Sequence, residues 1–171
     1  MGEHEKVEWA KVIWARTNIP RHAIVNWVFI QHKLPTKIRL NKYYHQEDTT
    51  CHLCKTAIED EQHLFFNCDY AKDVWREIKQ WWNLTPQEMH KARGTKGEKQ
   101  ITSAIVLAAI NHIWSARNHA LFRSIHTPTR QTVTQIKEQV IHRILYLNTI
   151  SRKIIHCIDS ILKLYRKKGD L

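Results

Sequence analysis

Three of the four cysteines in this 171-residue chain lie within eighteen residues, in the stretch CHLCKTAIEDEQHLFFNC at 51–68. With one histidine they form the pattern C-x2-C-x8-H-x4-C. Two cysteines separated by two residues fit a tight turn that directs both sulfurs at one ion, and a later His and Cys complete a tetrahedron. We therefore predict one structural Zn²⁺, held by Cys51, Cys54, His63 and Cys68. Because four protein ligands fill the coordination shell, this pattern indicates a structural rather than a catalytic ion.

The five-residue spacing of His63 and Cys68 restricts the local backbone. In a continuous α-helix, at about 100° per residue, the two side chains would lie about 140° apart. We therefore expect one or two helical turns that hold His63, a break near Asn67, and a new helix capped by Asp69. The two phenylalanines between the ligands should seal the site against that helix.

Other interpretations of this stretch stay open. The cysteines could be small core residues and His63 a surface residue. His52 is a rival ligand, although its place inside the Cys51–Cys54 turn should point its side chain away. The acidic run at 59–61 is expected to be a solvated turn near the metal, with catalysis as the less favoured alternative. Cys157 is expected to be a buried core thiol.

Apolar residues at helical spacing occupy most of the remaining chain. Glycine and proline are scarce, with four of each, while tryptophan occurs seven times. This pattern predicts a mostly α-helical protein. Most of the tryptophans, including Trp75 and Trp114, are expected in the core. The expected helices lie within 7–19, 21–33, 37–44, 69–82, 99–123 and 129–167.

Two of these helices carry specific expectations. The helix within 21–33 is apolar around most of its circumference, which predicts burial on nearly all sides. The helix at 37–44 should be capped by Thr36. Its apolar side chains are expected inward and its basic ones outward, with Ile38, Leu40 and Tyr43 in the first group and Lys37, Arg39 and Lys42 in the second.

The expected organisation has two lobes. A zinc-stabilised helical lobe at 1–89 is followed by a basic linker at 90–100 and by a C-terminal helical hairpin or bundle at 101–171. The last helix carries an apolar row that is wide for one hairpin partner, so it either packs internally or offers a surface to a protein partner or a second copy. That candidate interaction surface comprises Val133, Ile136, Val140, Ile144, Leu147, Ile154, Ile158 and Ile161.

The net charge of +11 is distributed unevenly. Residues 1–50 sum to +3, residues 51–89 to −3 and residues 90–171 to +11, so basic regions flank an acidic, cysteine-rich segment. This pattern fits an RNA or DNA partner, although solvated helix faces would give the same totals. The candidate nucleic-acid-binding residues combine phosphate-binding cations with stacking tyrosines. They are Lys33, Lys37, Arg39, Lys42, Tyr43, Tyr44, Lys91, Arg93 and Lys96.

The motifs along residues 7–82 resemble the zinc-binding domain at the C-terminal end of plant LINE-type (non-LTR) retrotransposon reverse transcriptases. The resemblance rests on the order of tryptophans, an LPTKIRL stretch, the four ligands in CHLC and EQHLFFNC, and the VW pair at 74–75. The IWSARNHALF segment at 113–122 is similar to a segment that often follows this domain. The acidic run at 59–61 departs from the single Glu usual in the family, and the last helix has no family motif.

The resemblance implies a helical fold around one zinc and a role in gripping nucleic acid during reverse transcription. It implies no catalytic activity, and the chain lacks the Asp-Asp pair that polymerase chemistry needs for its metal ions. We expect a non-enzymatic module, present as a stand-alone or domesticated C-terminal fragment. The alternative is a domesticated protein-interaction factor, such as a regulator, an inhibitor or a toxin/antidote component, acting through its apolar C-terminal helices.

The sequence also bears on the cellular setting. No apolar run approaches the roughly 20 residues needed to span a bilayer, and the N-terminus lacks the apolar segment of a signal peptide. We expect an intracellular protein, nuclear or cytoplasmic, with no membrane association and no small-molecule substrate. In that reducing setting, clustered cysteines are more often metal ligands than disulfide partners.

Overall fold

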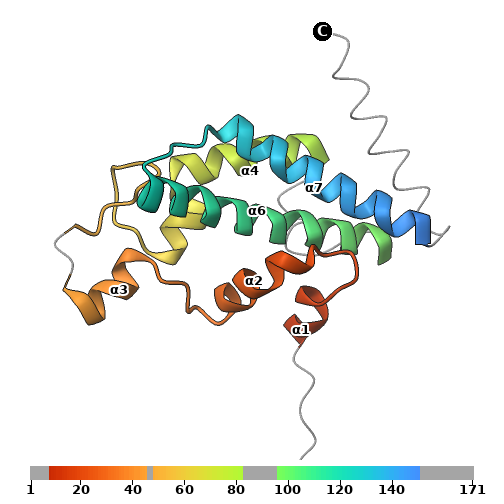
Figure 1. Cartoon of the computed structure of the whole chain (residues 1–171), viewed down its shortest axis with the longest axis horizontal. Helices are drawn as coiled ribbons and strands as arrows, with labels where there is room; N and C mark the ends of the chain where they lie inside the picture. Colours follow the sequence, from red (N-terminus) through yellow and green to blue (C-terminus); the bar gives the residue numbers. More distant parts are fainter. Residues whose placement is uncertain (1–7, 46–47, 83–95, 151–171) are drawn as a thin grey trace, which may run out of the picture.

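The computed structural model describes residues 8–45, 48–82 and 96–150 and is mostly helical, as predicted, with no strand among those residues (Figure 1). None of the described helices is both long and apolar enough to cross a membrane. The elements, in chain order, are α1 (Glu8–Ile13), η1 (Pro20–His22), α2 (Ala23–Ile30), α3 (Lys37–Tyr44), η2 (His63–Asn67), α4 (Asp69–Trp82), α6 (Lys96–Arg123) and α7 (Thr129–Ile150).

Helix α6 is the centre of the fold. It packs against α7 and α4 on one side and against α1, η1 and α2 on the other (Figure 1). At about 1.5 Å per residue its 28 residues run about 42 Å, which is long enough to contact both groups. Small side chains at Ala104, Ala108 and Ala109 are buried in these contacts. Helix α6 therefore joins the N-terminal and C-terminal parts of the chain.

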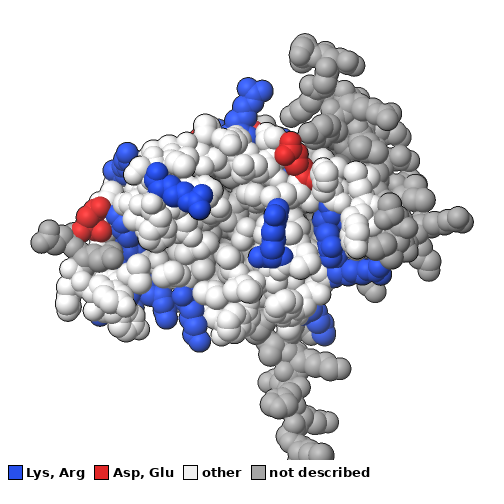
Figure 2. Space-filling view, viewed as in Figure 1, with Lys and Arg blue, Asp and Glu red and all other residues white. Residues whose placement is uncertain are grey.

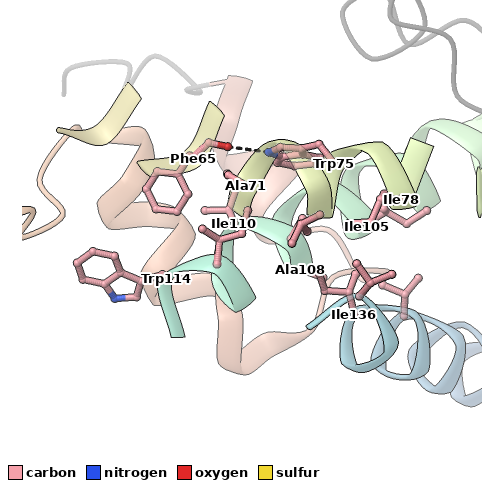
Figure 3. Close-up of a cluster of buried hydrophobic side chains, with 14 of the residues drawn as sticks. Phe65, Ala71, Trp75, Ile78, Ile105, Ala108, Ile110, Trp114 and Ile136 are labelled. Atoms are coloured by element: carbon pink, nitrogen blue, oxygen red, sulfur yellow. Dashed lines mark hydrogen bonds between the residues drawn. The ribbon is translucent and has the colours of Figure 1, made fainter. Parts of the chain in front are cut away.

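The hydrophobic core is continuous across both predicted lobes. Figure 3 shows Phe65, Trp75 and Ile78 from the zinc-side segment packed with α6 and with Ile136 of α7. Trp75 and Trp114 are buried, as predicted. The division at 90–100 stays a prediction. Helix α6, however, already begins at Lys96, and residues 83–95, which include Lys91 and Arg93, lie outside the described residues.

The structure corrects the candidate interaction surface on the last helix. The five members that it describes are nearly inaccessible, with exposed fractions of 0–3%. They pack in the core because α6 and α4 both contact α7 and together cover a row wider than one partner could cover. The buried members are Val133, Ile136, Val140, Ile144 and Leu147. Ile154, Ile158, Ile161, the helix beyond residue 150 and Cys157 lie outside the described residues.

Two expectations about the N-terminal helices were also wrong. Helix α2 is covered on one side only, because Ile24 and Trp27 are 68% and 45% exposed. On α3, Tyr43 is exposed rather than inward, and Lys37 is buried rather than outward. The Lys37 amine reaches Asp48, whose Oδ2 lies 2.8 Å from Nζ, so a charge partner makes the burial possible. The expected cap is confirmed, since the Thr36 hydroxyl accepts from the Arg39 N–H at 3.4 Å.

Candidate metal centre

The first two ligands lie on a short turn held by backbone hydrogen bonds. The Cys51 N–H donates to the Ala57 carbonyl at 2.8 Å, and the Lys55 N–H donates back to the Cys51 carbonyl at 2.8 Å. Thr50 and Ile58 form an antiparallel bridge just outside this turn. These contacts close residues 50–58 into a compact loop that brings both sulfurs of the C-x2-C pair to one side.

All four predicted ligands meet at one point. One donor atom from each of Cys51, Cys54, His63 and Cys68 lies within 4.8 Å of the others. Cys51 Sγ is 4.0 Å from Cys68 Sγ, and Cys54 Sγ is 3.3 Å from His63 Nε2. A tetrahedral zinc with Zn–S bonds of ~2.3 Å would separate two thiolates by about 3.8 Å. The donor set and its spacing are therefore compatible with one structural Zn²⁺, and His52 is not part of the cluster.

The five-residue interval between His63 and Cys68 is accommodated by a π-helical turn. Residues His63–Asn67 form η2, and the Cys68 N–H donates to the His63 carbonyl, five residues back, at 2.7 Å. This wider turn brings the two ligands closer together than an α-helix would. The regular helix breaks at Cys68, whose φ of −63° and ψ of 135° are extended, one residue after the predicted break at Asn67. The predicted departure from an α-helix is therefore present, but as a π-helical turn followed by an extended residue at Cys68.

A residue outside the predicted ligand set positions His63. The Asp60 carboxylate accepts from the His63 N–H at 2.6 Å, and the Asp60 carbonyl accepts from the Leu64 N–H at 3.0 Å. These are the bonds of a helix N-cap. The signal was readable in the sequence as an Asp three residues before His63. Asp69, which was expected to cap α4, is instead its first residue, and the Cys68 carbonyl accepts the Lys72 N–H.

The aromatic seal predicted for the site is half confirmed. Phe65 is fully buried, and its carbonyl accepts a hydrogen bond from Trp75 Nε1 at 2.6 Å, so η2 is fixed to α4 (Figure 3). Phe66 remains 48% exposed, although its ring stacks on Trp75 with centroids 6.3 Å apart. The inner phenylalanine therefore belongs to the core, and the outer one covers the edge of the tryptophan.

The contact between the two buried sulfurs shifts their pKa values in opposite directions. The contact with Cys68 lowers the pKa of Cys51 to about 5, and the same contact raises the pKa of Cys68, so one proton is shared between them. Burial lowers the pKa of His63, but the neighbouring Cys54 and Cys51 raise it by more, so the net shift of this pKa is upward. A divalent cation bound by these residues would replace this shared proton and would stabilise both sulfurs as thiolates.

Glu59 is the feature that the sequence interpretation missed most clearly. It was expected in a solvated turn, but its exposed fraction is 0%. Its Oε1 accepts from the Lys37 N–H at 3.0 Å, from Arg117 Nε at 3.0 Å and from Arg117 Nη2 at 2.6 Å. The first of these bonds lies at the N-terminus of α3, where a carboxylate is favourable. Glu59 therefore connects α3 and α6 with the metal loop, which we define as residues 50–62, the segment that precedes η2.

Arg117 is as deeply buried as its partner. Its exposed fraction is 1%, its Nη2 also donates to the Pro35 carbonyl at 3.4 Å, and its guanidinium lies 4.9 Å from the centroid of the Trp114 ring. A charge in the core requires such partners. Both Trp114 and Arg117 belong to the IWSARNHALF segment, so this stretch supplies the cation that neutralises the metal loop's buried acid.

One comparison with known proteins agrees with this geometry. Residues 1–75 match a family of zinc-binding segments in reverse transcriptase. The matched segment contains α1, α2, α3, the metal loop and all four candidate zinc ligands. Searches of curated proteins and of solved structures returned no significant match.

The candidate nucleic-acid-binding residues fall into three groups. Lys33, Lys42, Tyr43 and Tyr44 are exposed, and Arg39 is partly exposed, with its Nη1 donating to the His32 carbonyl at 2.9 Å. Lys37 is buried and does not contribute to a surface. Lys96 is the first residue of α6, at the edge of the described chain.

Proposed function

We propose that this chain is a non-catalytic, zinc-held nucleic-acid-binding module derived from a LINE-type retrotransposon reverse transcriptase of plants. In this proposal the zinc fixes the loop beneath α3, and α3 binds RNA or single-stranded DNA. The match of residues 1–75 to zinc-binding segments in reverse transcriptase supports a reverse-transcriptase origin. An intracellular location follows from such a partner.

The observation that carries the proposal is the composition of the exposed side of α3. Tyr43 and Tyr44 are 68% and 72% exposed at the end of the helix, beside the exposed Lys42. Tyrosines in such positions can stack on unpaired bases, and the neighbouring cations can contact phosphates. Residues 20–45 contain no Asp or Glu that would repel a phosphate backbone. Figure 2 shows that Lys and Arg also outnumber Asp and Glu on the face in view.

The alternative, a protein-interaction factor acting through the C-terminal helices, is less well supported. The described part of its apolar row is core rather than surface. The rest of that row lies outside the described residues.

Fluorescence anisotropy with a mixed-sequence RNA of about 30 nucleotides tests the proposal. The test variant changes Lys33, Arg39 and Lys42 together to Ser and is called the α3 variant, because two of these residues lie on α3 and Lys33 lies just before it. The matched control removes three positive charges from α4, where Lys72 and Arg76 already pair with Asp69 and Asp73, by changing Lys72, Arg76 and Lys79 to Ser.

The wild-type affinity should fall steeply between about 50 and 200 mM salt. The α3 variant should bind more weakly and should reduce the slope of log K against log salt by about 2, at roughly 0.7 for each phosphate that is no longer neutralised. Tyr43→Ala and Tyr44→Ala should each reduce the free energy of RNA binding by about 1–3 kcal/mol if the ring stacks on a base. Equal affinities for the α3 variant, the α4 variant and the wild type would exclude this surface.

A further inference from the structure

An apolar groove lies between α2, the loop that leads into α3, and the C-terminal half of α6. Its volume is about 380 Å³, and its walls are mainly hydrocarbon. The lining includes Ile24, Val28, Leu34, Leu40, Trp114 and Phe122. At its rim, Ile24 is 68% exposed and Phe122 is 75% exposed, so large apolar side chains from two helices face solvent together. Contiguous patches of this kind mark binding sites more often than scattered single residues do.

The charged group in this groove, the Arg117 guanidinium, is already engaged. Arg117 donates to Glu59, to the Pro35 carbonyl and, through Nη1, to Asn118 Oδ1 at 3.0 Å. Nucleobases are recognised through hydrogen bonds to their edges, and this lining offers few groups that could make them. Apolar side chains of a protein segment need no such bonds. The chemistry of the walls therefore favours a peptide over an extruded base.

The charge around the groove restricts the partner further. Residues 20–45 and 113–123, which supply the groove, contain no Asp or Glu. Arg21, Lys33 and Arg123 are exposed, and each lies next to or one turn from a lining residue. The nearby acids Glu59 and Glu61 are paired with Arg117 and His32. The rim is thus positive, which favours a negatively charged partner.

The positive rim disfavours two possible occupants from this protein, a second copy and the segment 151–171. A second copy would place one basic rim against another. Residues 151–171 contain six Lys or Arg and two Asp or Glu, so this segment is basic as well. We propose that the groove docks an acidic amphipathic helix of another protein, with apolar side chains in the groove and carboxylates toward Arg21, Lys33 and Arg123. This proposal does not depend on nucleic-acid binding by α3.

Selection from a phage-displayed library of random 16-residue peptides tests the proposal on the full zinc-loaded chain. The groove variant is Ile24→Ser with Phe122→Ser, and the matched control is Ile125→Ser with Leu145→Ser. All four side chains are exposed by 40% or more, so neither variant removes a core residue.

Enriched peptides should carry apolar residues at i, i+3, i+4 and i+7 with an excess of Asp and Glu. Their affinity should fall at least tenfold on the groove variant and should be unchanged on the control. Enrichment of uncharged or basic peptides, or no enrichment relative to the groove variant, would overturn the proposal. If no acidic peptide is enriched and the groove variant loses RNA binding, the groove binds nucleic acid instead. If the wild type dimerises with increasing concentration and the groove variant does not, the groove binds a second copy.

Discussion

Glu59 and Arg117 form an ion pair in the interior of the protein, with Nη2 and Oε1 2.6 Å apart and side-chain exposures of 0% and 2%. Fifty-eight residues separate them in the chain. Glu59 lies on the metal loop, and Arg117 lies in the C-terminal half of α6. The pair therefore makes the metal loop and the central helix parts of one structure.

The first prediction follows from this pair. Glu59→Gln keeps the shape of the side chain but leaves the Arg117 charge buried without a counter-charge. Breaking one side of a buried ion pair typically costs about 3–5 kcal/mol. Urea unfolding of the zinc-loaded protein should show a loss of that size. Glu61→Gln, which removes the pairing with the largely exposed His32, should cost less than about 1 kcal/mol.

The double variant Glu59→Leu with Arg117→Met distinguishes the effect of an uncompensated buried charge on stability from the effect of altered packing. If the uncompensated charge causes the loss, the double variant should be more stable than Glu59→Gln, because apolar replacements of buried pairs are often nearly neutral. A Glu59→Gln protein as stable as the wild type would show that the pair is not buried in solution.

A second prediction concerns pH. His22 is 4% exposed, and burial, aided by the nearby His112, lowers its pKa from 6.5 to about 4. Above pH 6.5 the side chain is neutral in both the folded and unfolded states. As the pH falls toward 4, only the unfolded state binds the proton, so stability is lost. The loss should reach up to about 2 kcal/mol by pH 5, at about 1.36 kcal/mol per pH unit.

The measurement compares urea unfolding at pH 7 and pH 5 for the wild type and for His22→Gln. Protonation of the metal ligands in the unfolded state contributes equally to both proteins, so the difference between them isolates His22. The variant should lose less stability over this interval than the wild type. An identical loss in both would mean that His22 titrates normally in the folded protein.

A third prediction separates core from surface on α7. Ile144 is 2% exposed, while its neighbour Leu145 is 40% exposed. Ile144→Ala should therefore destabilise the protein by about 2–5 kcal/mol. Leu145→Ala should change its stability by about 0.5 kcal/mol or less. Thermal and urea unfolding check both values, and similar costs at the two positions would contradict the core assignment of this row.

The sequence was most informative where spacing has a direct geometric meaning. The four ligands were predictable because C-x2-C and a distant His and Cys can satisfy one tetrahedral ion. The amphipathic helix at 69–82 and the cap at Thr36 were predictable because apolar period and capping chemistry are local properties. The five-residue interval between His63 and Cys68 required a departure from an α-helix, but it did not distinguish a break from a π-turn.

Burial was harder to predict, because it depends on elements far apart in the chain. An acidic run resembles a solvated turn until a partner such as Arg117 is brought to it from 58 residues away. Lys37 is buried for the same kind of reason, through Asp48. Helix α2 contains enough apolar residues for full burial, but the described chain covers only one side. The residues that the sequence misassigned are therefore those whose surroundings are set by tertiary contacts.

The most direct test of the zinc-held fold is native mass spectrometry of the purified full chain with and without changes to the ligands. One zinc per chain should be found in the wild type and in His52→Ala. The zinc should be lost in Cys68→Ser, together with much of the stability of both halves, because structural zinc binding contributes on the order of 10 kcal/mol to folding in small zinc-finger peptides. A wild-type chain that binds no zinc, or a Cys68→Ser chain that retains a full equivalent, would contradict a fold held by these four ligands.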